Sequence, residues 1–151
     1  VDVVDDKIIL KHRKMAKLVV GLSSGSIDKL VGLGVMLSGA AADDMEIEVY
    51  VLLTAARAFL KENEFLNDSF VEYPHLKEEM LAKMKELDVQ HWADSFRQVK
   101  EFTECKFYIC SLAGKMWNGV EKDQFIDVVD DFSGIFQYIE AAQKADLHIN
   151  I

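Results

Sequence analysis

Cys110 is the residue of this chain best suited to do chemistry. It ends a short apolar run, residues 107–109, and the segment that follows, residues 111–116, is typical of a turn passing into a helix. A thiol at the end of a buried strand and near the start of a helix lies beside unpaired backbone N–H groups, and the helix dipole there favours an anion. We therefore expect this position to favour the thiolate, which is the nucleophilic form of cysteine. The pattern predicts sulfur chemistry at one thiol.

The second cysteine, Cys105, stands five residues before Cys110. On one extended strand the two residues are about 16 Å apart and their side chains face opposite sides. A disulfide needs Cα atoms within about 7 Å of each other, so we expect no internal bridge. We also expect no shared metal site, because C-x4-C without a histidine pair is a weak zinc pattern. Cys105 is interpreted as an ordinary cysteine at the start of the strand. For Cys110 the interpretation as a small buried hydrophobe stays open, since most free cysteines are of that kind.

Few other side chains are placed for catalysis. Lys115, one helical turn beyond Cys110, can supply positive charge to a thiolate or to an acidic donor, although a solvated lysine is the alternative. His75, His91 and His148 are far apart in the sequence and have no metal-ligand spacing. Each is better interpreted as a surface or capping histidine than as a catalytic base.

Composition excludes several classes of function. The 151 residues are half hydrophobic, which suits one domain with a substantial core. A formal charge of −9 argues against a nucleic-acid partner, which would need a basic face. The longest apolar stretch, residues 30–42, contains three glycines and falls short of the roughly 18 residues of a membrane span, so we interpret it as a buried helix.

Cysteine usage and the start of the chain bear on compartment and boundaries. Two cysteines are too few for a disulfide scaffold and indicate a reducing interior, so we expect a cytoplasmic protein. Residues 1–14 begin without methionine and carry a cluster of charge, and we interpret them as an N-terminal extension of doubtful origin. The remaining residues, 15–151, are expected to form the single domain.

From residue 17 onward, strand and helix patterns alternate. Strands separated by helices imply right-handed crossovers and a parallel sheet. We therefore predict a single-domain α/β fold: a doubly wound, mainly parallel five-stranded sheet with helices on both faces, a flavodoxin/Rossmann-like three-layer sandwich. The predicted strands are 18–22, 45–53, 106–110 and 147–151, with 124–128 as a fourth strand or a loop; the predicted helices are 27–42, 55–60, 91–101, 115–118 and 134–145, with one more helix in an excursion over 61–90.

Ligands of such sheets gather beyond the carboxyl ends of the strands, where Cys110 and the loop over residues 23–26 both fall. That loop lacks the Gly-Lys-Ser/Thr ending of a phosphate loop. Gly32, Gly34 and Gly39 lie inside a helix and do not have dinucleotide spacing. We expect them to permit close packing on the sheet, with Ser26 capping that helix and Thr54 capping the next one.

Three segments resemble one known family. Residues 23–30 (SSGSIDKL), 38–42 (SGAAA) and 106–119 (KFYICSLAGKMWNG) are similar to the DsrE/DsrF-like sulfurtransferase superfamily, which includes DsrH-type and TusD-type proteins. The likeness covers nearly everything after Met15. It implies that Cys110 matches the cysteine that receives a sulfane sulfur, as a persulfide or a thiosulfonate, and hands it to a partner protein. It also implies a homo- or hetero-oligomer and requires no cofactor and no metal.

The predicted chemistry is a sulfur relay. The Cys110 thiolate takes a sulfane sulfur from a donor, such as a TusA-like or rhodanese-like carrier, and holds it until an acceptor thiolate removes it. Backbone N–H groups at Ser111 and Leu112 are expected to stabilise the anion. The pocket is expected to be bordered by four residues of the first loop and helix, Ser23, Ser24, Gly25 and Lys29, and by Lys115. Two alternatives stay open: a small-ligand-binding α/β module with Cys110 incidental, and a non-catalytic oligomeric subunit.

Overall fold

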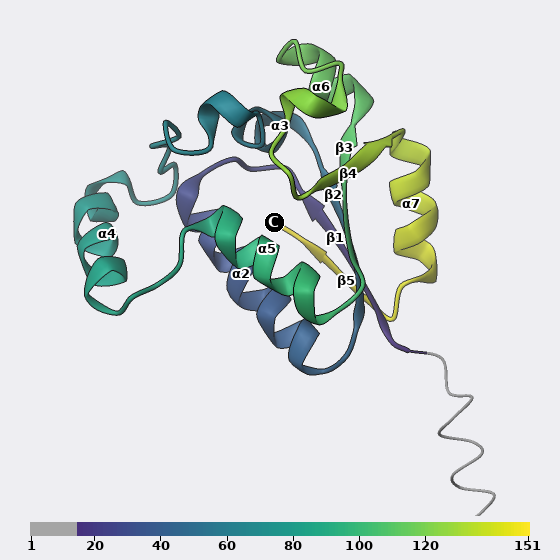
Figure 1. The fold of residues 1–151 in the computed structure, drawn as a ribbon, viewed down its shortest axis with the longest axis horizontal. Coiled ribbons are helices and arrows are strands. Elements are labelled where there is room, and N and C mark those ends of the chain that lie inside the picture. The colour runs from purple at the N-terminus through teal and green to yellow at the C-terminus, as the bar shows by residue number, and fades with distance from the viewer. Residues whose placement is uncertain (1–14) are drawn as a thin grey trace, which may run out of the picture.

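A single parallel sheet forms the centre of the fold (Figure 1), as the sequence predicts. The computed structural model describes residues 15–151, so the predicted extension over 1–14 lies outside the described residues. The sheet has five strands in the order β4-β3-β2-β1-β5, and every pair of neighbours is parallel. The strands are β1 (Lys17–Leu22), β2 (Glu46–Val51), β3 (Cys105–Cys110), β4 (Val129–Ser133) and β5 (Leu147–Asn150).

Helices cover both faces of the sheet, which makes the fold a three-layer α/β sandwich. Helices α2 (Ile27–Ala42) and α5 (Trp92–Phe102) lie side by side on one face, and α7 (Ile135–Lys144) lies on the other (Figure 1). The chain adds strands in one direction from β1 to β4, and α7 then carries it back to the far side of β1, where β5 pairs. This reversal is what makes the sheet doubly wound.

The two faces bury different side chains. The face under α2 and α5 holds a large apolar cluster that includes Leu33, Phe96 and Phe107. The face under α7 holds a small cluster built on Val19, Tyr50 and Tyr138. In β1 and β2 strand alternation assigns the residues to one cluster or the other, because successive side chains point to opposite faces.

Of the two alternatives predicted for residues 124–128, a fourth strand or a loop, the structure shows the loop. Residues 124–128 are not a strand; β4 starts at Val129, and the segment before it contains a short 3-10 helix, η3 (Lys122–Gln124). The side chain of Gln124 is engaged in capping this turn, since its Oε1 accepts hydrogen bonds from the backbone N–H groups of Val120 and Glu121. A residue whose side chain folds back on its own backbone does not continue into a sheet ladder.

Two short helices at the carboxyl edge begin earlier than predicted. Helix α3 (Leu53–Ala58) starts one residue before Thr54, so Thr54 lies within the helix and is not its cap. Helix α6 (Ser111–Met116) starts directly after β3, with Cys110 at the N-cap position and no intervening turn. The chain therefore passes from strand to helix within one residue at the candidate nucleophile.

The glycines of α2 do not lie against the sheet. A side chain at Gly34 would come within 3.0 Å of Ser95 in α5, whereas positions 32 and 39 face open space. Close packing at Gly34 is thus between two helices. Ser26 occupies the N-cap position of α2, although its side chain makes no capping hydrogen bond and donates to Asp28 instead.

The excursion between α3 and α5 contains one α-helix, as predicted, and stands away from the sheet (Figure 1). This helix, α4, buries none of its residues. No helix among residues 15–151 is long and apolar enough to cross a membrane. The other regular elements of the excursion are two 3-10 turns, and the bounds are α4 (Lys77–Glu86), η1 (Lys61–Asn63) and η2 (Pro74–Leu76).

Candidate functional site

Cys110 lines a cavity of about 420 Å³ at the carboxyl edge of the sheet. It is half-buried. The alternation of β3 directs its side chain to the face opposite that of Cys105, and at the end of the strand it also packs against the large apolar cluster that contains Cys105. The walls come from three successive strand ends: the β2–α3 junction, the β3–α6 junction and the β4–α7 junction. The residues that share the cavity with the thiol are Leu52, Leu53, Leu112, Ala113, Gly134 and Ile135.

The walls of this cavity are apolar. No described residue that lines it carries a charged or polar side chain, apart from the thiol itself. Three of the wall residues are nevertheless open to solvent, with exposed fractions of 53% for Leu53, 67% for Leu112 and 54% for Ile135. The half-buried Cys110 thus lines an open cavity whose other walls are apolar.

The backbone of Leu53 holds one wall in an unusual conformation. Its φ of 45° lies in the left-handed region, which a bulky residue rarely adopts. Its carbonyl oxygen accepts a hydrogen bond of 2.9 Å from Trp117 Nε1, and the Arg57 guanidinium lies 6.0 Å from the Trp117 ring centroid. The end of α6 is thereby tied to Leu53, which is itself one of the cavity walls. Such a strained residue persists only where its surroundings hold it.

The hydrogen bond between Trp117 and Leu53 was not predicted from the sequence. Trp117 carries only the general signal of an aromatic residue near a helix end, and Leu53 continues an apolar run that is typical of a strand. The contact joins residues 64 positions apart. Neither periodicity nor local composition predicts a pairing over that distance.

Cys105 has the opposite environment. It is 4% exposed, on the face covered by α2 and α5, and both cysteines are free thiols. Burial raises the pKa of the Cys105 thiol to about 12, partly offset by the charge of Lys100. The Lys100 ammonium donates to the Cys105 carbonyl oxygen at 2.9 Å and pairs with Asp130 at 2.6 Å. A protonated, enclosed thiol of this kind is inert at neutral pH.

Of the predicted pocket residues on α6, the structure brings only Leu112 into the cavity with Cys110. The Ser111 hydroxyl is directed toward β4 and donates to the Ser133 carbonyl oxygen at 3.3 Å. Lys115 is exposed and is not among the cavity walls. The predicted positive charge beside the thiol is therefore absent from the described walls.

The loop after β1 is at the same edge of the sheet but does not line the cavity. The Ser23 hydroxyl donates to the carbonyl oxygen of the last residue of the chain at 3.3 Å, and Ser24 Oγ accepts from a backbone N–H two residues later. Thr54 links this loop to α3: its Oγ1 donates to the Ser23 carbonyl oxygen at 3.1 Å and accepts from the Gly25 N–H at 3.3 Å. Through these hydrogen bonds the loop is connected to the start of α3, which forms one wall of the cavity.

Lys29 is committed to an ion pair. Its ammonium contacts the Glu72 carboxylate of the excursion, and that hydrogen bond raises the pKa of Lys29 above its ordinary value. The pairing connects α2 to the excursion and places the charge away from the cavity walls.

His91 and His148 are placed as expected from the sequence. The ring of His91 caps α5, where its Nδ1 accepts from the Ala93 N–H at 3.3 Å. His148 is exposed on β5, and its Nε2 lies 2.6 Å from the Tyr138 hydroxyl, which donates to Asn150 at 2.8 Å. The contacts of His148 belong to the packing of α7 and β5. None of the contacts of His91 or His148 involves Cys110.

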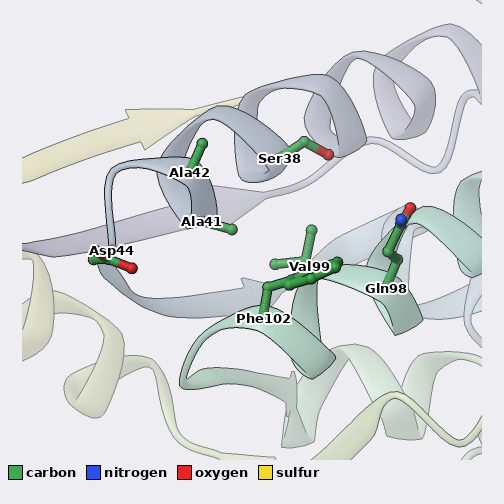
Figure 2. A pocket seen from close by; sticks show the side chains of 7 residues that line it. All are labelled: Ser38, Ala41, Ala42, Asp44, Gln98, Val99 and Phe102. Atoms are coloured by element: carbon green, nitrogen blue, oxygen red, sulfur yellow. The ribbon is translucent and has the colours of Figure 1, made fainter.

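A larger cavity of about 500 Å³ lies at the other edge of the sheet, between the C-terminal ends of α2 and α5 (Figure 2). It combines small and apolar side chains with isolated polar groups and holds no nucleophile and no pair of carboxylates among its described walls. Nothing in it indicates chemistry. Its walls are Ser38, Ala41, Ala42, Asp44, Gln98, Val99 and Phe102.

The fold and the site together define a class: a parallel α/β protein with one accessible thiol at the carboxyl edge of its sheet. No protein-family model matches the chain, and no curated protein matches it either. The function therefore has to be inferred from the geometry and from the chemistry of the thiol.

Proposed function

We propose that this protein is a sulfur carrier that accepts a sulfane sulfur on Cys110 and passes it to a partner protein. One observation supports the proposal above all others: the Cys110 thiol opens into a cavity at the carboxyl edge of a doubly wound sheet, the edge at which such folds bind and react. The other thiol of the chain is buried and protonated. Sulfur chemistry thus has one place to occur.

The proposed reaction is two successive thiol exchanges. The Cys110 thiolate attacks the outer sulfur of a donor persulfide, so that a new S–S bond forms as the donor S–S bond breaks and the donor leaves as a thiolate. An acceptor thiolate then attacks the outer sulfur of the Cys110 persulfide and releases the Cys110 thiolate. The electrons balance within each exchange, so thiols and sulfur suffice and no cofactor or metal is required.

The resemblance to the DsrE/DsrF-like superfamily supports the same proposal and suggests its partners. It implies a TusA-like or rhodanese-like protein as donor or acceptor and assembly into a homo-oligomer, and the cysteine usage suggests a cytoplasmic location. Phe136 and Ile139 on the outer side of α7 are 76% and 49% exposed, which suits a subunit contact. The resemblance allows a persulfide or a thiosulfonate on Cys110, and the proposed exchange forms the persulfide.

One observation favours a second candidate function. The cavity walls are apolar enough to hold a small organic ligand, in which case Cys110 would be incidental. A non-catalytic oligomeric subunit is the remaining alternative. Both differ from the carrier in one respect: neither needs the thiol.

Intact-protein mass spectrometry separates these functions. Wild type, Cys110→Ser and Cys105→Ser are each incubated with polysulfide and then treated with dithiothreitol. The carrier predicts that wild type and Cys105→Ser gain sulfur atoms that dithiothreitol removes, whereas Cys110→Ser gains none. Sulfur loading that persists in Cys110→Ser, or that is absent from all three proteins, contradicts the proposal.

A further inference from the structure

We propose that, where Cys110 takes sulfur from a small molecule and not from a protein persulfide, that donor is uncharged, an elemental sulfur chain or ring or a neutral organic polysulfide, and that the cavity disfavours sulfur oxyanions such as tetrathionate and thiosulfate. This inference rests on the proposed function, which it narrows to one class of substrate. It comes from the walls of the cavity and not from the cysteine alone.

An anion in the cavity loses hydration free energy. The walls nearest the thiol are leucine, isoleucine, alanine and glycine, and no described wall residue offers a hydroxyl, amide or cationic side chain. An oxyanion that enters loses part of its water without side-chain hydrogen bonds in exchange, which is unfavourable. An uncharged sulfur chain loses little hydration on the same path.

No cationic side chain of the described residues lines the cavity. Lys115 is exposed on α6 but is not a wall residue. The Arg57 guanidinium lies over the Trp117 ring, 6.0 Å from its centroid, and Trp117 in turn bonds the Leu53 backbone. Lys29 is paired with Glu72. An enzyme that accepts thiosulfate would be expected to aim at least one cation at the reacting sulfur.

Apolar surface is exposed at the mouth of the cavity. Leu53, Leu112 and Ile135 are each more than half exposed, and all three surround the same opening. Covering apolar surface contributes about 25 cal/mol per Å². An apolar donor recovers this free energy when it binds, whereas a hydrated anion does not. Sulfur is soft and polarisable, and it packs well against carbon.

The chemical step balances without a further reactant. The Cys110 thiolate attacks one sulfur of the chain, the new S–S bond forms, and the adjacent S–S bond of the donor breaks with its electron pair on the departing sulfur. From an organic trisulfide the remainder leaves as a thiolate or persulfide anion. From a sulfur ring the remainder stays attached as the anionic end of an opened chain.

The test compares an uncharged and an anionic donor on the full chain. Dimethyl trisulfide and tetrathionate both react with simple thiols, so the rate at which each modifies Cys110, followed by intact mass, is divided by its rate with 2-mercaptoethanol under the same conditions. The Cys110→Ser variant supplies the background. We expect the normalised rate for dimethyl trisulfide to exceed that for tetrathionate by about tenfold or more, because of the desolvation penalty of the anion.

A charge placed on the wall sharpens the comparison. Leu112→Lys introduces a cation at the mouth on a side chain that is already 67% exposed, so folding is not at risk. Leu87→Lys is the matched control, since Leu87 is 70% exposed and lies beyond α4, outside the cavity walls. We expect Leu112→Lys to raise the normalised tetrathionate rate several-fold and Leu87→Lys to leave it unchanged.

The outcomes separate the inference from the proposed function. Equal normalised rates for the two donors in wild type would overturn the inference and leave the sulfur carrier standing. Failure of both donors to modify Cys110 would overturn the carrier itself. A preference for dimethyl trisulfide that Leu112→Lys shifts and Leu87→Lys does not shift supports both.

Discussion

The two ends of β3 carry the same side chain in opposite environments. Cys105 starts the strand under α2 and α5 and is closed off from solvent, while Cys110 ends it on the other face and opens into a cavity. Five residues of one strand thus separate an inert thiol from an accessible one. The comparison shows that position on the sheet, and not residue type, assigns the chemistry.

The difference has a physical cause at each edge. At the amino edge Asp130 accepts hydrogen bonds from both Lys100 and the Phe107 N–H, so a network of charged and backbone groups fills the space beside Cys105. At the carboxyl edge the chain leaves β2, β3 and β4 into α3, α6 and α7. These helices leave the strand ends in different directions (Figure 1). A cavity lies at the three junctions.

The largest expected effect is the loss of sulfur loading in Cys110→Ser. The proposed exchange needs a thiolate, and a hydroxyl at this position does not replace it. Cys105→Ser should load like wild type, as measured by polysulfide incubation and intact mass. The opposite pattern, with Cys105 required and Cys110 dispensable, would reverse the assignment of the two ends.

Opening the closed end is expected to cost the most stability. Phe107 is fully buried, and its ring lies 5.1 Å from that of Phe96 and 6.0 Å from that of Phe59. Phe107→Ala should lower the free energy of unfolding by about 3–5 kcal/mol in urea titrations. It should also accelerate alkylation of Cys105 relative to Cys110. A loss below about 1 kcal/mol would mean that the core beside Cys105 is not tightly packed.

The raised pKa of Cys105 predicts a dependence of stability on alkaline pH. Between the ordinary thiol pKa of 9.0 and about 12 the folded state keeps the Cys105 proton and the unfolded state loses it, so stability falls as pH rises. The slope from this thiol alone approaches about 1.4 kcal/mol per pH unit.

Tyr50, Tyr108 and Tyr138 also have pKa values raised by burial and add slopes of the same sign at higher pH. The contribution of the thiol is therefore isolated by comparing wild type with Cys105→Ala in urea titrations from pH 8.5 to 10. The variant should show a shallower loss. Parallel curves would indicate that Cys105 ionises normally and that the two ends of the strand are more alike than the structure shows.

The smallest effect is expected from the hydrogen bond between Trp117 and Leu53, beside the Cys110 cavity. Trp117→Phe keeps an aromatic ring but removes the donor to the Leu53 carbonyl oxygen, which should cost about 1 kcal/mol of stability. Leu53 would then be free to leave its left-handed conformation, so the cavity should admit bulkier reagents. We expect the rate of Cys110 with a large maleimide to rise relative to its rate with iodoacetamide.

Phe102→Leu is a matched control, because Phe102 lies at the opposite edge in the larger cavity (Figure 2). The ratio of maleimide to iodoacetamide rates should not change there. A ratio that changes equally in both variants would show that Trp117 acts on general stability and not on access to the thiol.

Much of the arrangement of β3 was predictable from the sequence. The period of two along a strand places Cys105 and Cys110 on opposite faces, and the strand followed by a helix places Cys110 at the carboxyl edge. The parallel order of the sheet follows from the alternation of strands and helices. These features depend on local patterns, which a sequence displays directly.

The surroundings of the thiol were not predictable in the same way. The walls at Leu52, Leu53 and Ile135 come from segments far from Cys110 in the sequence, and only the order of strands brings them together. The loop over residues 23–26 was expected to border the pocket, but β2 and the start of α3 lie between that loop and the thiol. The sequence predicted either a strand or a loop over residues 124–128, because the capping by Gln124 that favours the loop is not visible in the apolar pattern after it.

The most direct test of the central claim is to locate the sulfur in wild type. The protein is loaded with polysulfide, alkylated with iodoacetamide and digested, and the peptides that contain Cys105 and Cys110 are compared by mass spectrometry. The account predicts an alkylated persulfide on Cys110 and an unmodified thiol at Cys105. A persulfide on Cys105, or its absence from Cys110 after loading, would contradict it.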